Sequence, residues 1–165
     1  MSTQAPTIDQ AKPVSPESAR EQERLLLTTQ ARRGSAWFYW IAGLSLVNSI
    51  VISSGGSWSF VLGLGLTAGV DYIAREAAGS GLVMAWAFNV VVCAAFVLCG
   101  YFARKERRWA YLAGIAAYAA DGVLVLAARD WLAFAVHVLG LFFIWGGLAA
   151  LTKRHKLQLP DTVTP

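Results

Sequence analysis

The stretch from Ala110 to Ala128, AYLAGIAAYAADGVLVLAA, decides the fold of this chain. Asp121 is its only charged residue, and Arg107, Arg108 and Arg129 flank the stretch. As a helix, a run of this length crosses a hydrocarbon core of about 30 Å, because each residue adds about 1.5 Å. A carboxyl group inside such a span costs roughly 3 kcal/mol, so it usually faces protein or water and often marks a functional site. Asp121 is therefore the first candidate functional residue.

The composition of the whole chain is typical of a membrane protein. Of its 165 residues, 56% are hydrophobic and 15% are charged, and the charges collect in a few clusters. Soluble domains are more polar and are built from shorter apolar elements. We therefore predict an all-α, polytopic membrane helix bundle whose surroundings are a lipid bilayer.

Five apolar segments make up the predicted bundle. Short loops join them, so neighbours along the chain should be antiparallel in space. Five of the seven tryptophans lie near segment ends, where aromatic side chains favour the membrane interface. The first interpretation is therefore five spans, at about Ser35–Ile52, Trp58–Ala74, Leu82–Ala103, Ala110–Ala128 and Trp131–Leu151.

The second segment leaves another interpretation open. Its glycines, Gly63, Gly65 and Gly69, permit an irregular backbone where the segment is buried in protein, which would give four spans and one re-entrant segment. Gly65 and Gly69 also form a GxxxG step, which lets two helices approach closely in an ordinary span. These two glycines are the candidate helix-packing residues.

Polar regions flank the bundle, which we place at residues 34–152. Residues 1–33 are expected to form a polar tail with a short helix from about residue 15. Ser15 suits an N-cap, Pro16 the first helical position and Glu17 the first turn. Residues 153–165 are expected to form a basic and then polar C-terminal tail.

Basic clusters predict the orientation in the membrane. Residues 104–108 and 153–156 are the strongest clusters, and the positive-inside rule places both, with the C-terminus, in the cytoplasm. Five spans would then put Arg32 and Arg33 outside, which the same rule disfavours, whereas four spans remove this conflict. The expected location is a bacterial-type inner or cytoplasmic membrane.

Depth along antiparallel helices predicts which polar groups meet. Asp121 lies nine residues before Asp130 in a turn and His137 lies seven after it, so the two differ in depth by only about 3 Å. Tyr118 shares a helix face with Asp121 and could donate a hydrogen bond to it. A carboxyl group beside an imidazole could relay protons or coordinate a cation, or it could simply link two helices.

Asp71 and Asn89 match in depth in the same way in the preceding hairpin. An offset of 50 residues aligns Asp71 with Asp121, which suggests a duplicated helical hairpin. Arg75, one turn after Asp71, offers a plainer explanation as a local ion pair. The candidate polar seam, for transport or for linking helices, therefore contains Asp121, His137, Tyr118, Asp71 and Asn89.

The chain offers little for enzyme or cofactor chemistry. Cys93 and Cys99 are too far apart along one helix to act together, and His137 is the only histidine within a predicted span. We find no motif for haem, flavin, nucleotide or an iron–sulfur cluster and predict no metal site or catalytic residue, although cofactors stay unknown. The net charge of +4 is explained by loops at the membrane surface, so nucleic acid is not an expected partner.

Two classes of function remain. The first expectation is a non-enzymatic structural or accessory subunit of a larger membrane complex, because the protein is small and has small-residue faces for packing. Its partners would be other membrane subunits or further copies of the chain. The alternative is a proton- or cation-coupled transporter or channel that uses the polar seam.

Overall fold

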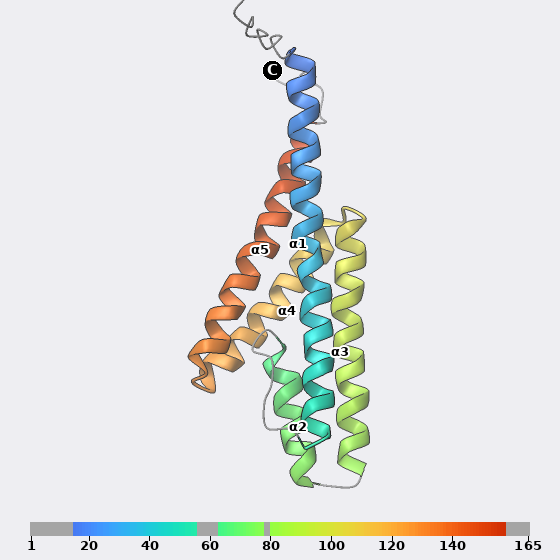
Figure 1. Ribbon diagram of the computed structural model, residues 1–165, viewed down its shortest axis with the longest axis vertical. Coiled ribbons are helices and arrows are strands. Elements are labelled where there is room, and N and C mark those ends of the chain that lie inside the picture. The colour runs from blue at the N-terminus through green and yellow to red at the C-terminus, as the bar shows by residue number, and fades with distance from the viewer. Residues whose placement is uncertain (1–14, 56–62, 78–79, 158–165) are drawn as a thin grey trace, which may run out of the picture.

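The computed structural model describes residues 15–55, 63–77 and 80–157, and these residues form helices and short turns (Figure 1). The described helices are α1 (Pro16–Ser53), α2 (Gly65–Ala77), α3 (Ser80–Arg104), α4 (Arg108–Ala127) and α5 (Trp131–Lys156). The prediction of an all-α bundle is therefore confirmed.

Four of these helices, α1, α3, α4 and α5, are long and apolar enough to cross a membrane. Large hydrophobic side chains such as Met84 and Phe142 are exposed on them, so a lipid bilayer is the environment that fits this surface. The helix α2 has 13 residues, which reach only about 20 Å at 1.5 Å per residue. The described residues thus fit four spans and a short helix rather than five spans. Residues 58–62 of the predicted second segment lie outside the described residues.

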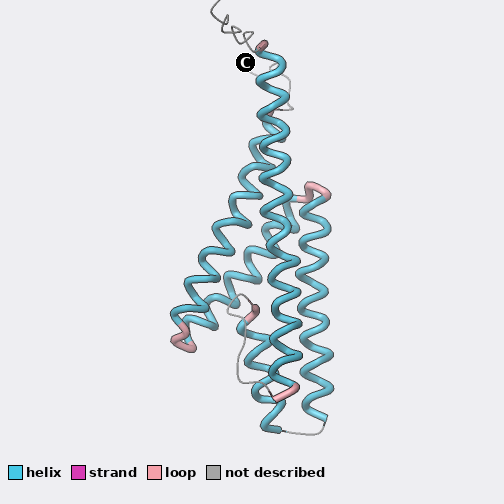
Figure 2. The backbone as a smooth tube through the Cα atoms, viewed as in Figure 1, coloured by secondary structure: helices cyan, strands magenta, loops and turns pink. Residues whose placement is uncertain are grey.

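The helix α2 packs against α1, α3 and α4 on one face and exposes Tyr72 and Ile73 on the other. In Figure 1, α2 begins beside the middle of α3 and ends near the first residues of α3. Figure 2 shows that the loop residues before α2 lie at the middle of the bundle, whereas the turns after α3 and α4 lie at the ends of helices. The start of α2 therefore lies beside other helices at mid-depth rather than at an end of the bundle.

The helix α1 is longer than any membrane span needs. Ser15 is its N-cap and accepts a hydrogen bond from the Ser18 amide at 3.3 Å, and Pro16 and Glu17 occupy the first turn. The helix then runs without a break for 38 residues, so the short helix expected in the tail is the first part of α1. That first part projects beyond the other helices (Figure 1).

Ion pairs gather the basic clusters at the projecting end. Lys153 pairs with Glu23 at 2.8 Å, and Arg154 pairs with Glu106 at 2.6 Å. These contacts join the start of α1, the α3–α4 turn and the end of α5. The basic clusters at 104–108 and 153–156 therefore lie beside the first part of α1, and four spans remove the conflict in orientation that five spans created.

The helices α1 and α5 cross at two glycines. A Cβ added to Gly34 would lie 2.5 Å from the Cα of Gly147, so neither position has room for a side chain. The Tyr111 hydroxyl, from α4, donates to the Ala31 carbonyl beside this crossing. The predicted step at Gly65 and Gly69 behaves differently, because an added Cβ at Gly69 would meet no described atom within 4 Å. A Cβ at Gly65 would collide with Cγ2 of Val125 in α4, so the close approach is present at Gly65 and absent at Gly69.

Candidate functional site

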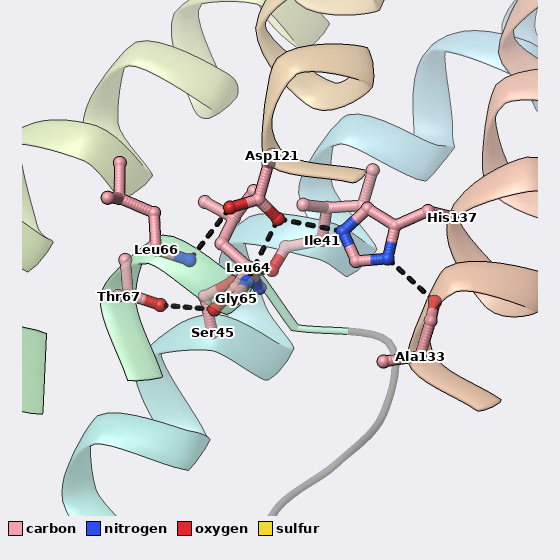
Figure 3. A network of polar contacts seen from close by, with 9 residues as sticks. All are labelled: Ile41, Ser45, Leu64, Gly65, Leu66, Thr67, Asp121, Ala133 and His137. Atoms are coloured by element: carbon pink, nitrogen blue, oxygen red, sulfur yellow. Dashed lines mark hydrogen bonds and ion pairs between the residues drawn. The ribbon is translucent and has the colours of Figure 1, made fainter. Parts of the chain in front are cut away.

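The start of α2 is partly buried and rests on Asp121, which comes from α4 (Figure 3). The Gly65 amide donates to Oδ2 of Asp121 at 2.9 Å, and the Leu66 amide donates to Oδ1 at 2.7 Å. The first amides of any helix lack partners within it, and a carboxylate is also favoured by the positive end of the helix dipole. Asp121 thus caps α2 from another helix.

Side chains of α1 and α2 form hydrogen bonds with the backbone amide and carbonyl of Leu64, the residue just before α2. Ser45 accepts a hydrogen bond from the Leu64 amide at 2.8 Å and donates to the Ile41 carbonyl at 2.8 Å. The Thr67 hydroxyl donates to the Leu64 carbonyl at 2.9 Å (Figure 3). Backbone groups inside a membrane protein need such partners because the hydrocarbon offers none.

His137 completes the cap from α5. Its Nε2 lies 2.7 Å from Oδ2 of Asp121, and its Nδ1 lies 2.8 Å from the Ala133 carbonyl. The tight α4–α5 turn sets this register: Arg129 adopts a φ of 61°, and Asp130 caps α5 by accepting from the Ala133 amide at 3.0 Å. The contact between Asp121 and His137 is the one expected from their depths. Both side chains are buried, at 4% and 1% exposure.

The partners of the imidazole fix the number of protons in this pair. The Ala133 carbonyl can only accept, so Nδ1 of His137 carries a hydrogen. The contact between Nε2 and Oδ2 then holds one further hydrogen, supplied by an imidazolium or by a protonated carboxyl group. The pair of Asp121 and His137 therefore shares one proton and has no net charge.

Tyr118 lies beside the pair in a way the sequence did not predict. Its ring stacks on the His137 imidazole with centroids 4.4 Å apart and an angle of 20°. Its buried hydroxyl has no hydrogen-bond partner among the described residues, so the expected donation to Asp121 is absent. Gly140 makes room for the ring, since a Cβ there would lie 2.8 Å from Cε1 of Tyr118.

An open cavity of about 420 Å³ lies on one side of the pair, between α2 and the adjoining ends of α4 and α5. Its lining is mostly apolar and reaches from Asp130 at the turn to His137. On the other side, toward the basic end, Tyr118 packs against Phe96, and Phe96 packs against Phe38. These three aromatic side chains are buried. The pair thus lies between a cavity and a closed aromatic core.

The remaining seam residues form a second cluster. Asn89 from α3 donates to Oδ1 of Asp71 at 2.6 Å and to the Ser49 hydroxyl at 2.9 Å. Arg75 is exposed, and no ion pair joins it to Asp71 in the described part of the chain, so the local-pair explanation is wrong. Asp71 follows Gly65 by six residues, which is about 9 Å along α2. The predicted seam is therefore two clusters, one at the start of α2 and one along it.

The chain matches no protein-family model, no curated protein and no solved structure. Among the described residues, no three His, Cys, Asp or Glu side chains gather as metal ligands. Sequence reasoning missed the backbone amides of Gly65 and Leu66, because backbone donors leave no residue type to recognise. The short second segment and its glycines were the only signal that a helix could begin inside the bundle.

Proposed function

We propose that the protein is a proton-coupled membrane transporter or channel in which Asp121 and His137 bind and release the coupling proton. One observation carries this proposal: a short helix starts inside the bundle, and its first amides rest on a buried carboxyl–imidazole pair beside a cavity. Transporters commonly place their sites at such helix starts near the middle of the membrane.

The shared proton supports a link between proton exchange and movement of α2. If the pair loses its proton, the carboxylate faces the lone pair of Nε2, and the two groups repel. If the pair gains a proton, two hydrogens point into one contact. Either change opens the contact between Nε2 and Oδ2, and Oδ2 also holds the Gly65 amide. Proton exchange therefore acts directly on the start of α2.

The surroundings of Asp121 favour a proton over a metal cation at this pair. Both carboxylate oxygens already accept amide hydrogens, and Oδ2 also contacts His137. The start of a helix carries a partial positive charge, which repels a cation placed beside it. Of the proton and cation alternatives, the pair therefore suits the proton.

Access from one side also fits a transporter. The cavity reaches the pair from the α4–α5 turn, and the aromatic core separates the pair from the basic end. The positive-inside rule places the basic end in the cytoplasm, so the cavity would open on the opposite face of a bacterial-type inner or cytoplasmic membrane. Access from one face at a time is what alternating access requires.

Proton flux into proteoliposomes tests this function. The protein is reconstituted with a pH-sensitive dye inside the vesicles, and a pH gradient is imposed with valinomycin and potassium to balance charge. We expect flux above that of empty vesicles, reduced at least tenfold in Asp121→Asn and in His137→Gln. Tyr111→Phe is the matched control, because it removes a buried hydrogen bond away from the pair. Equal flux in wild type and Asp121→Asn, or no flux in wild type, would overturn the proposal.

A structural or accessory subunit remains the second candidate, and one observation favours it. Among the described residues, the hydrogen bonds of the Asp121 carboxylate join α4 to α2 and α5, as a helix-linking role requires. Purification in a mild detergent from cells with native expression levels separates the two candidates. Co-purification of defined larger subunits, together with vesicles that carry no flux, would establish the accessory role.

A further inference from the structure

The second polar cluster has more oxygen acceptors than donors. Asp71, Asn89 and Ser49 come from α2, α3 and α1, and their side chains are at most 2% exposed. The Asn89 amide uses its nitrogen for both Asp71 and Ser49. Oδ2 of Asp71 and Oδ1 of Asn89 are buried and have no hydrogen-bond partner in the described part of the chain.

Asp121 provides an internal comparison for this cluster. Its carboxylate meets two backbone amides and an imidazole, so donors surround it. Asp71 meets one amide hydrogen from Asn89, and no described Lys, Arg or His lies within ion-pair distance of it. Buried polar atoms in native proteins are almost always satisfied, so the orphaned oxygens of Asp71 and Asn89, two residues that a hydrogen bond joins, call for a hydrogen-bond donor or a cation.

We propose that Asp71, Asn89 and Ser49 form a binding site for a monovalent alkali cation, with Na⁺ as the fitting example. The ligands are Oδ2 of Asp71, Oδ1 of Asn89 and the Ser49 hydroxyl oxygen, which keeps a second lone pair beside the one that takes the Asn89 hydrogen. Hard cations prefer such oxygen ligands.

The cluster contains one carboxylate, that of Asp71, so it favours a monovalent cation over a divalent one. One carboxylate neutralises one monovalent cation, whereas a divalent ion would leave an uncompensated charge in apolar surroundings. Divalent sites in proteins gather several carboxylates, and no such group exists among the described residues. The buried thiol of Cys93 lies one turn after Asn89 on α3, but it is not one of the proposed cation ligands.

A bound cation would hold α2 against α1 and α3, because its three ligands come from these three helices. The pair of Asp121 and His137 holds the start of the same helix against α4 and α5. The cation site does not depend on the proposed proton-coupled function. If both are present, α2 connects them.

Thermal unfolding of the purified full-length protein in detergent tests the site. Melting temperatures are measured in LiCl, NaCl, KCl and choline chloride at constant ionic strength. We expect NaCl to raise the melting temperature in a saturable way relative to choline chloride, by roughly 5 to 10 °C at a hundredfold excess over the dissociation constant. Equal melting temperatures in all four salts would overturn the proposal. A proton on Asp71 or a bound water would then satisfy the two oxygens.

Variants distinguish the site from general salt effects. Asp71→Asn removes the charge and should abolish the difference between NaCl and choline chloride. Ser49→Ala removes one neutral ligand and should raise the Na⁺ midpoint about tenfold, which keeps the test valid if Asp71→Asn does not fold. Asp121→Asn is the matched control, and its response to Na⁺ should persist.

A response that survives in Asp71→Asn, or an unchanged midpoint in Ser49→Ala, would contradict the site. Because none of these readouts measures flux, failure here is separate from failure of the transport assay.

Discussion

At the scale of single residues, the two buried aspartates differ in what surrounds them. Asp121 accepts hydrogen bonds from two backbone amides and shares a third with His137, whereas Asp71 accepts one and keeps an orphaned oxygen. The sequence showed that both residues lie in apolar runs and matched each to a polar partner in depth. It could not show the donors, because those at Asp121 include backbone amides that are 55 and 56 residues away along the chain.

Two buried tyrosines should differ in how much their hydroxyl groups contribute to stability. Tyr111 donates to the Ala31 carbonyl, whereas the Tyr118 hydroxyl has no partner among the described residues. Tyr111→Phe removes this hydrogen bond, although the carbonyl keeps its partner within α1, and should cost about 1 kcal/mol of stability. Tyr118→Phe keeps the stacked ring and should change the free energy of unfolding by less than about 0.5 kcal/mol. Chemical or thermal unfolding in detergent measures both variants, and the reverse order of cost would contradict these contacts.

At the scale of elements, the short helix α2 is the feature that the sequence only partly predicted. The glycines of the second segment and the conflict in orientation indicated that the segment need not cross the membrane. They did not show where the helix begins. Its start depends on a carboxylate from α4 and a hydroxyl from α1, which become neighbours only after the bundle has formed. The limits of α3, α4 and α5 were closer to the prediction, because continuous apolar runs bounded by charges define them.

The two glycines of the GxxxG step should differ in their tolerance to alanine. A Cβ at Gly65 would collide with Cγ2 of Val125, whose branched side chain has little freedom in a helix. Gly65→Ala should therefore cost about 1 to 3 kcal/mol. Gly69→Ala meets no described atom within 4 Å and should be neutral or slightly stabilising. Melting temperatures of the two variants check this contrast, and equal destabilisation would indicate an ordinary packing step at both positions.

At the scale of the whole molecule, the basic clusters lie at one end. The cavity extends from the α4–α5 turn, away from that end, to His137. The ion pair of Lys153 with Glu23 joins α5 to the first part of α1, two segments that the sequence could place on one side only by giving up the fifth span. Arg154 pairs with Glu106, in a cluster that the sequence already placed on the same side. The duplicated hairpin stays a prediction. Each hairpin contains an Asp with a polar partner on the next helix, but α2 has 13 residues and α4 has 20.

Topology labelling tests the four-span arrangement. In a variant in which Ser replaces both cysteines, Ser18→Cys and Lys156→Cys should react with a membrane-impermeant maleimide from the same side of oriented vesicles. Arg129→Cys, at the α4–α5 turn, should react from the other side. Labelling of Ser18→Cys and Lys156→Cys from opposite sides would indicate an odd number of spans and contradict the arrangement.

Hydrogen exchange at the start of α2 reports directly on whether Asp121 caps this helix. Exchange of a peptide that covers residues 63–70 is followed by mass spectrometry in wild type and in Asp121→Asn, with a peptide from α3 as the internal control. We predict slow exchange of the Gly65 and Leu66 amides in wild type, and exchange roughly 10- to 100-fold faster in the variant while α3 stays unchanged. Rapid exchange of these amides in wild type, or equal rates in both proteins, would contradict the cap.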